Sequence, residues 1–376
     1  MKILVLNAGS SSLKYELWNN AETQLKRGTV EVGGTGVSAC PSVEAAMQIT
    51  LRNLDGQTID AAGHRVVHGG DKYHASILID AAVESEIDNL SELAPLHNPH
   101  ALEGIRAVRA RLPKIPQVAV FDTAFHHTLP PRAYTYALPY EYSTFGHIRR
   151  YGFHGISHRY VSWRFAELHG KSRDEFRLIT CHLGNGCSIC AIDHGRSVDT
   201  SMGFTPLEGL VMGTRSGDVD AGAILHLLTH EKLSPDAVLR ALNNDSGLKG
   251  ISGVSNDMRD IQKAAAQGNE RAALAIDVFC YHARKYIGAY LAAMNGADAL
   301  ILTGGIGENS PETRAQICGS MDALGISLHP AANNASSKED RLIGSSRVEV
   351  WVVPTNEEML IARDTLHCVN GTPCDI

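Results

Sequence analysis

The chain has no stretch that approaches the about 20 apolar residues of a membrane span. After Met1 and Lys2 it has only a strand-length apolar run, which is too short for the hydrophobic region of a signal peptide. We therefore expect a cytoplasmic protein with no membrane partner. An excess of positive charge is also lacking, because the formal net charge is −7. This balance argues against nucleic acid as the main partner.

Cysteine is scattered, with eight in 376 residues, which is ordinary for a cytosolic enzyme with reduced thiols. Cys187-x-x-Cys190 has zinc-ligand spacing, but it stands alone, and in a strand its two side chains point to opposite faces. His97-x-x-His100 and His126-His127 have no carboxylate partner at ligand spacing. We therefore expect these histidines at the surface or behind a site, with no structural zinc.

Long low-complexity linkers and short-period repeats are absent, but one large repeat is present. A strand-turn-strand unit at 4–17 (LVLNAGSSSLKYEL) recurs at 179–193 (ITCHLGNGCSICAID). Glycine allows close approach of the backbone, so each turn presents several N–H groups to one anion, and Lys14 adds a positive charge. One such turn is more often only a hairpin. Two in one chain favour a split cradle for the phosphates of a nucleotide.

A third glycine segment, ADALILTGGIGEN at 297–309, runs from an apolar strand into a turn against which a nucleotide could lie. A P-loop requires Gly-Lys-Ser or Gly-Lys-Thr at the end of its glycine turn, and the chain has neither. A dinucleotide fingerprint requires a third glycine where Ser310 stands. The three segments therefore favour a nucleotide site built on hairpins.

These residues closely resemble the acetate kinase family, within the superfamily of acetate and sugar kinases, heat-shock-70 proteins and actin. The resemblance covers nearly the whole chain, and it includes NAGSSSLKYEL from Asn7, GHRVVHGG from Gly63, VFDTAFH from Val120, YGFHGISHRYVS from Tyr151 and TGGIGENS from Thr303. It implies an α/β fold of two duplicated ribonuclease-H-like domains of the actin and hexokinase type. Each is expected to be a five-stranded mixed sheet flanked by helices, with an active-site cleft between the domains.

The resemblance places the first domain at 1–124 plus 361–376, with the first phosphate turn and the acyl substrate. The second domain is expected at 125–360, with the second phosphate turn, the adenosine site and the interface of a homodimer. Apolar residues at helical spacing also predict a long helix over 269–295 in the second domain.

The chemistry of this family is the reversible transfer of the ATP γ-phosphoryl group to acetate, giving acetyl phosphate and ADP. Acetate has a pKa near that of a glutamate side chain, about 4.3, so at pH 7 it is an anion that needs no general base. It needs positive charge and hydrogen-bond donors around the transferring group. We expect Arg65 to hold the carboxylate and Arg215, in the glycine-rich segment MGTRSGD, to bind the phosphoryl oxygens.

The resemblance implies the other roles. His154 is expected to donate a hydrogen bond in the transition state, and Asp122 to organise magnesium waters and orient Arg65 or the substrate. Magnesium, or manganese in its place, is expected at Asn7 and Glu357. The acyl pocket is expected to comprise Arg65, Val67, Leu96, Phe153 and Pro206. The nucleotide is expected to contact Ser10, Ser12, Lys14, His182, Leu183, Gly184, Asn185, Gly186, Asp257, Met258, Arg259, Gly305, Ile306, Gly307, Glu308 and Asn309.

Two alternatives stay open at this point. A propionate kinase is the nearer one, because one methylene in an apolar pocket changes discrimination by only about 1–3 kcal/mol. The other is a non-catalytic nucleotide switch of the actin or heat-shock type, which would need neither Arg65 and Arg215 nor an acyl pocket.

Overall fold

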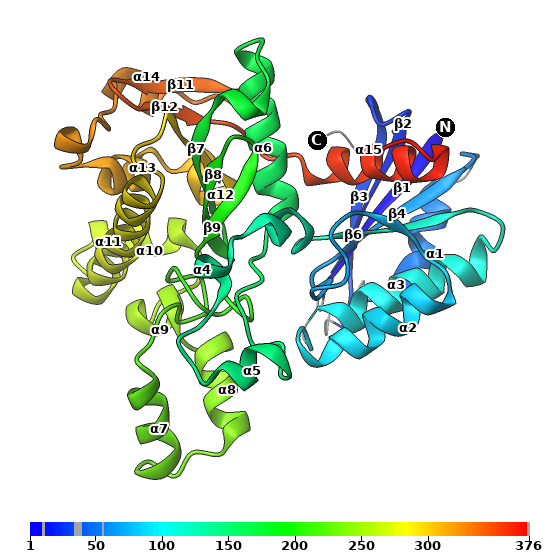
Figure 1. Cartoon of the computed structure of the whole chain (residues 1–376), viewed down its shortest axis with the longest axis horizontal. Helices are drawn as coiled ribbons and strands as arrows, with labels where there is room; N and C mark the ends of the chain where they lie inside the picture. The colour runs from blue at the N-terminus through cyan, green and yellow to red at the C-terminus, as the bar shows by residue number, and fades with distance from the viewer. Residues whose placement is uncertain (10–11, 34–39, 55, 96, 374–376) are drawn as a thin grey trace. The chain divides into compact units, whose positions relative to one another are not determined.

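The structure is a computed structural model that describes residues 1–9, 12–33, 40–54, 56–95 and 97–373. The chain forms two compact units (Figure 1). Unit 1 comprises Met1–His127, Phe153–Tyr160 and Asn356–Ile376, and unit 2 comprises Thr128–Gly152 and Val161–Thr355. Two of the expected site residues, Ser10 and Leu96, lie outside the described residues.

Unit 1 is a mixed sheet between two layers of helices, with strand order β3-β2-β1-β4-β6-β5. Its elements are β1 (Lys2–Ala8), β2 (Ser12–Asn19), β3 (Thr23–Glu31), α1 (Val43–Asn53), β4 (Ala61–Val66), β5 (Ile77–Leu78), α2 (Ala81–Asn89), α3 (Asn98–Arg111), β6 (Gln117–Phe121) and α15 (Glu357–Asn370). Figure 1 shows α15 on one face of this sheet and α1, α2 and α3 on the other. The α15 layer lies close, since a Cβ on Gly63 would be 2.2 Å from the Thr365 Oγ1.

The sequence pattern explains the first hairpin. Leu13, Tyr15 and Leu17 of β2 are buried, and Lys14 between them is exposed, as the alternation predicts. The three buried side chains belong to a core cluster that also contains Met47 of α1. The Ser42 side chain caps α1 by accepting a hydrogen bond from the Ala45 N–H (3.2 Å). This packing fixes the strands that flank the first glycine turn.

Unit 2 contains the second sheet, with strand order β11-β12-β10-β7-β8-β9. Its strands are β7 (Arg177–Leu183), β8 (Cys187–Asp193), β9 (Arg196–Thr200), β10 (Ala299–Thr303), β11 (Arg341–Ser345) and β12 (Glu349–Val352). Its helices are α4 (Pro131–Tyr134), α5 (Tyr140–Thr144), α7 (Ala221–Thr229), α8 (Pro235–Asn244), α9 (Gly247–Ser252), α10 (Met258–Ala266), α11 (Glu270–Ala293), α12 (Gly304–Asn309), α13 (Pro311–Cys318) and α14 (Pro330–Asn334). A further helix, α6 (Gly155–Leu168), has residues in both units.

The two sheets repeat one topology, so the expected duplication is confirmed. In each, the first three strands form an antiparallel meander, and the first strand also pairs in parallel with the next strand of the core. The expected count of five strands is wrong, because each sheet has six. The additional strands are β5 and β11, which pair antiparallel at the edges. A strand of two residues such as β5 is too short to give a periodic signal in the sequence.

Two local predictions can be compared with the structure. The helix predicted over 269–295 is confirmed as α11. The expected open turn at TGGIGEN is wrong, because Gly304–Asn309 forms the short helix α12. The Glu308 carboxylate stabilises that helix by accepting a hydrogen bond from the Gly304 N–H (2.9 Å).

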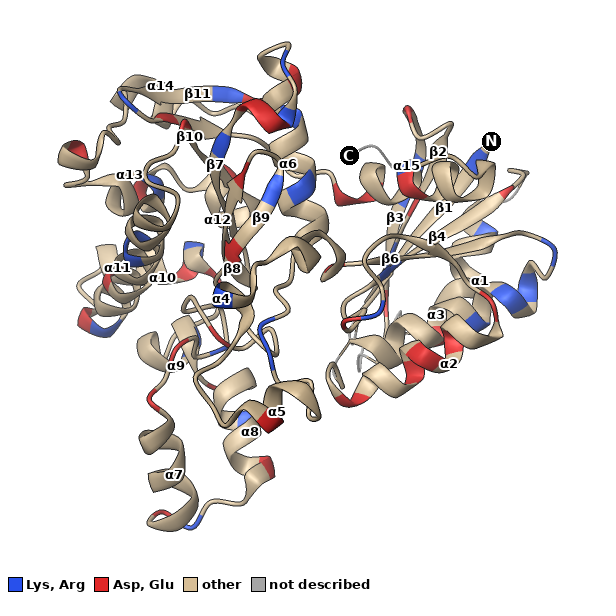
Figure 2. Cartoon of the chain, viewed as in Figure 1, with Lys and Arg blue, Asp and Glu red and all other residues tan. Residues whose placement is uncertain are grey.

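Charged residues of both signs lie on α2 and α3 (Figure 2). Arg106 donates to Glu84 (2.7 Å) and to Asp88 (3.2 Å), so these charges balance one another. Over the part of the chain that the structure describes, none of the helices has the length and apolar character needed to cross a membrane.

Candidate active site

An arginine paired with two carboxylates lies at the carboxyl end of β4 in unit 1. Arg65 donates through Nε and Nη2 to the two oxygens of Asp122 (3.0 and 2.7 Å), and its Nη1 lies 3.5 Å from Glu357 Oε2. Asp122 is almost fully buried, whereas the Arg65 side chain is 19% exposed. Burial opposes the charged guanidinium, but Asp122 and Glu357 outweigh it and raise the pKa of Arg65. The result is a fixed, permanently charged guanidinium on a side chain that is still partly exposed.

Glu358, the second acidic residue of α15, has different surroundings from Glu357. Burial, with the neighbouring charge of Glu357, raises the pKa of Glu358. Glu357 instead faces Arg65. The geometry therefore favours Glu357 over Glu358 as an oxygen donor, a choice for which the sequence offers only the family resemblance.

The residues that follow Arg65 in the sequence include apolar and aromatic groups. Val67 is half-buried and precedes His68, whose ring meets that of Phe153 edge-on at 5.4 Å. Asn98 fixes this segment, since its side chain accepts the His68 N–H (3.1 Å) and donates to the His68 carbonyl (3.0 Å). Phe153 is itself buried, and its carbonyl lies 3.0 Å from His126 Nε2. Buried polar partners in unit 1 thus hold Phe153 and the residue that follows Val67.

The turn that carries His154 is pressed against Asp122. His154 has a left-handed φ of 54°, and α6 begins at the next residue. The Gly155 N–H donates to the Asp122 carbonyl (3.0 Å), and a Cβ on Gly155 would lie 2.1 Å from that oxygen. Only glycine permits so close an approach. The structure therefore ties the expected positions of Asp122 and His154 together.

Gly155→Ala is expected to lower kcat by about 100-fold, because the added Cβ forces a shift of Asp122 or His154 of the order of 1 Å. Steady-state kinetics with thermal unfolding measures the effect. Gly288→Ala is the matched control: Gly288 lies in α11 with open space around its Cβ position, so activity should be unchanged. A Gly155→Ala variant with parental kcat contradicts the role given to this contact.

The first glycine turn joins β1 to β2. The Gly9 N–H donates to the Ser12 carbonyl (2.9 Å), and Asn7 lies directly opposite Lys14 in the strand register. Residues opposite each other in neighbouring strands share one face of the sheet. Asn7 and Lys14 are thus placed side by side, and both were expected at the phosphates or the metal.

The second and third glycine segments meet in unit 2. β7 and β10 are parallel neighbours with His182 beside Thr303, and a Cβ on Gly304 would lie 2.8 Å from the Leu183 carbonyl. A cavity of about 400 Å³ opens where these strands end. Ligands bind beyond the carboxyl ends of parallel strands in such folds. The lining residues are Gly184, Asn185, Asn256, Asp257, Met258, Arg259, Gly305, Ile306 and Asn309.

Eight of the expected nucleotide residues line this cavity, and the ninth lining residue, Asn256, was missed. The Asn256 side chain donates to Asn185 Oδ1 (3.0 Å), and no local motif signals that contact. Leu183 and Gly307 are buried behind the cavity. The Glu308 carboxylate accepts the N–H groups of Gly304 (2.9 Å) and Thr355 (3.1 Å), so it holds the backbone of the site.

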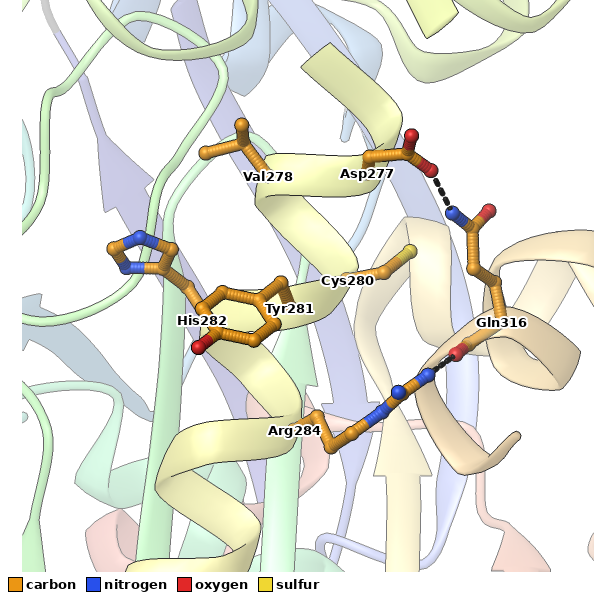
Figure 3. Close-up of a pocket in the computed structure, with 7 residues that line it drawn as sticks. All are labelled: Asp277, Val278, Cys280, Tyr281, His282, Arg284 and Gln316. Carbon is orange, nitrogen blue, oxygen red and sulfur yellow. Dashed lines mark hydrogen bonds between the residues drawn. The ribbon is translucent and has the colours of Figure 1, made fainter. Parts of the chain in front are cut away.

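A second cavity of about 400 Å³ lies between α11 and α13 (Figure 3). Three of its polar lining residues bond to one another: Gln316 donates to Asp277 (2.5 Å), and Arg284 donates to the Gln316 backbone carbonyl. These bonds use three of the groups that could otherwise orient a ligand. The cavity beside the glycine segments is therefore the better nucleotide site.

Arg215 lies beside the second phosphate turn. The Gly213 N–H donates to the Asn185 carbonyl (2.9 Å), which ties the MGTRSGD segment to that turn. Arg215 Nη1 donates to the Pro206 carbonyl (2.9 Å). A charged guanidinium held next to a glycine turn suits the binding of phosphoryl oxygens.

Two α/β units of one topology, with glycine turns at their strand ends and partly buried arginines beside them, define a nucleotide-dependent phosphotransferase of the duplicated ribonuclease-H-like class. The chain belongs to the Acetokinase family, whose sequence model matches residues 34–363.

Relatives and solved structures match over nearly their whole length. The acetate kinase of Halothermothrix orenii is 50% identical, over 99% of this chain and 100% of the relative. The acetate kinase of Thermotoga maritima is 48% identical, over 98% and 99%. The crystal structure of Porphyromonas gingivalis acetate kinase has a TM-score of 0.91 and 44% identity, covering 98% of this chain and 99% of that one. A propionate kinase from Francisella tularensis has a TM-score of 0.91 and 40% identity, covering 97% and 98%.

Proposed function

We propose that this chain is an acetate kinase that transfers the γ-phosphoryl group of ATP to acetate and also catalyses the reverse reaction. The observation that carries the proposal is the Arg65 guanidinium, which Asp122 holds through two hydrogen bonds while the side chain stays 19% exposed. A carboxylate substrate fits a guanidinium held in this way, with Val67 and Phe153 expected around its methyl group. The similarity to acetate kinases over the full length supports the same activity.

The proposed reaction requires little covalent chemistry from the protein. A carboxylate oxygen of acetate attacks the γ-phosphorus in line, the bond from that phosphorus to the bridging oxygen breaks, and ADP leaves with the negative charge. Arg65 orients the attacking carboxylate. Arg215 and a hydrogen bond from His154 stabilise the charge on the transferring phosphoryl oxygens. Because acetate is already ionised at pH 7, neither His154 nor His182 acts as a base.

The donor set in unit 1 fits magnesium, with manganese as a substitute. Magnesium prefers oxygen ligands, keeps several waters and uses one or two carboxylates with substrate phosphates. Asn7 offers an amide oxygen, and the Glu357 side chain is 11% exposed and faces Arg65. Among the described residues there is no group of three or more histidine, cysteine or acidic side chains that would hold a metal unaided. A bound metal would neutralise charge on the phosphates.

The reverse reaction gives a direct test. Purified protein with ADP, acetyl phosphate and magnesium should form ATP, measured with a coupled hexokinase assay. Chelation with EDTA should abolish the signal, and added magnesium should restore it. A protein that forms no ATP under these conditions contradicts the proposal.

We also propose that the chain forms a homodimer through unit 2. Helix α7 has the apolar sequence AGAILHLLT, yet none of its residues is buried, and Leu225 is 60% exposed. Leu239 on the neighbouring α8 is 56% exposed. Apolar surface of this kind is typical of a subunit interface. A cytoplasmic location and the lack of a nucleic-acid partner stay predictions from the sequence.

Light scattering after gel filtration tests the homodimer. The parent should have twice the chain mass of 40.5 kDa. Leu225→Asp should shift the protein to the monomer mass, because a buried unpaired carboxylate disfavours association. Leu25→Asp, at a 40% exposed residue of β3 in unit 1, should stay dimeric. A dimeric Leu225→Asp variant, or a monomeric parent, rules out this interface.

A further inference from the structure

We infer that Tyr136, Arg150 and Glu208, here named the Glu208 clamp, are positioning residues that hold the segment at 200–206 and through it Arg215. The inference rests on the proposed function, because it assigns Arg215 a place in phosphoryl transfer. In the sequence, Tyr136 and Arg150 precede β7, and Glu208 follows β9. All three residues belong to unit 2.

The Glu208 carboxylate is the centre of the clamp. Its Oε1 accepts from Arg150 Nη2 (2.6 Å), and its Oε2 accepts the Tyr136 hydroxyl. The Tyr136 oxygen in turn accepts the Phe204 N–H (2.9 Å). One hydroxyl group therefore links the carboxylate to the backbone of the segment. Charge-assisted bonds of this kind are about twice as strong as neutral ones.

Arg150 donates hydrogen bonds to the backbone at the start of the same segment. Its Nη1 lies within 2.9 to 3.0 Å of three consecutive carbonyls, those of Thr200, Ser201 and Met202. Burial opposes the charge on Arg150, but Glu208 outweighs it and raises the pKa of the guanidinium. Arg150 therefore stays charged and keeps its donors pointed at the backbone. A lysine could not present the same planar set of donors.

Gly203 has no Cβ, and this leaves space for the Glu208 carboxylate and the Tyr136 hydroxyl. A Cβ on Gly203 would lie 1.6 Å from Glu208 Oε2 and 2.2 Å from the Tyr136 hydroxyl oxygen. The Gly203 carbonyl accepts the N–H groups of Tyr151 (3.0 Å) and Gly152 (3.3 Å). The segment that the clamp holds thus also binds the backbone of Tyr151 and Gly152, the two residues that precede Phe153 in the sequence.

Pro206 connects the clamp to Arg215. It lies between Gly203 and Glu208, and its carbonyl accepts Arg215 Nη1 (2.9 Å). If the clamp loosens, that carbonyl moves and Arg215 loses its fixed orientation. The nucleotide cavity lies on other segments, lined by Met258 and Ile306 among others. Loss of the clamp should therefore lower kcat and leave KM for ATP close to the parental value.

The test uses Tyr136→Phe in the full chain, with Tyr134→Phe as the matched control on the preceding helix α4. Tyr136→Phe should lower kcat by about 10- to 100-fold, the effect of a sub-ångström to 1 Å displacement. In an Arg215→Ala background the same change should cost less than about twofold, because the clamp acts through Arg215. Tyr134→Phe keeps its ring against Arg149 and should leave kcat unchanged.

Hydrogen exchange gives a second measurement that does not require turnover. In Tyr136→Phe the peptide covering 200–206 should exchange faster, because Phe204 loses the acceptor of its N–H. Unchanged exchange overturns the clamp whether or not the parent phosphorylates acetate. Equal losses of kcat in the parental and Arg215→Ala backgrounds also overturn it, since they reveal a general structural effect. A parent inactive with every carboxylate, but with faster exchange in the variant, refutes the proposed function and keeps the clamp.

Discussion

Arg65→Ala lowers kcat/KM for acetate by about three orders of magnitude or more, the largest effect that we expect of a single substitution. The change removes the positive charge that lets an anionic carboxylate approach an anionic phosphoryl group. It also leaves Asp122, almost fully buried, without the guanidinium that pairs with both its oxygens. Breaking a buried pair in this way destabilises a protein by about 3–5 kcal/mol. Steady-state kinetics and urea unfolding of the same variant separate the two effects.

Two further variants sharpen this prediction. Arg65→Lys keeps a positive charge but loses the planar fork, so it should recover stability more than activity. Arg106→Ala removes an exposed arginine of α3 that pairs with Glu84 and Asp88, and it should leave kcat/KM unchanged. If Arg65→Ala retains the parental kcat/KM, then Arg65 does not bind the carboxylate and the proposed acyl site is wrong.

Arg215→Ala lowers kcat by about 10³- to 10⁵-fold, the range found when an arginine that neutralises a phosphoryl group is removed. KM for ATP should change far less, because the adenosine side of the nucleotide lies against Met258 and Ile306 in our proposal. The measurement is initial-rate kinetics at saturating acetate over a range of ATP concentrations. Arg196→Ala, at an exposed residue of β9, is the control that should match the parent.

The Arg215 result also separates an enzyme from a nucleotide switch. A non-catalytic switch needs no arginine at the γ-phosphate, so it would bind ATP equally well with or without Arg215. If the variant turns over acetate at the parental rate, the arginine has no catalytic role, and the part given to Arg215 in phosphoryl transfer is wrong.

Local patterns predicted most of the fold and much of the candidate site. The alternation in β2 and the helical spacing in α11 are properties of contiguous residues, and both elements formed as predicted. The glycine segments at Gly184 and Gly305 likewise predict that a ligand can lie close to the backbone, and both line the cavity that we propose for the nucleotide. The roles of single residues came from the family resemblance, since an isolated arginine such as Arg215 is indistinguishable from a surface residue by sequence alone.

The features that were missed depend on contacts between distant segments. Asn256 meets Asn185 across 71 positions, and Glu208 meets Tyr136 across 72. Neither pair has a motif, because each side chain is placed by the tertiary fold and not by its neighbours in sequence. Glu308 shows the converse: its neighbours Gly307 and Asn309 suggest a ligand contact, but its carboxylate is occupied by the backbone of Gly304 and Thr355.

The measurement that tests the account most directly is kcat/KM for formate, acetate, propionate and butyrate with magnesium and ATP, with the acyl phosphate trapped as its hydroxamate. We predict a clear maximum at acetate, because Val67 and Phe153 are expected to lie around its methyl group. A maximum at propionate would keep the roles of Arg65 and Arg215 and make the chain a propionate kinase, consistent with its likeness to the Francisella tularensis structure. No turnover with any of the four carboxylates would contradict the proposal that this chain is a carboxylate kinase.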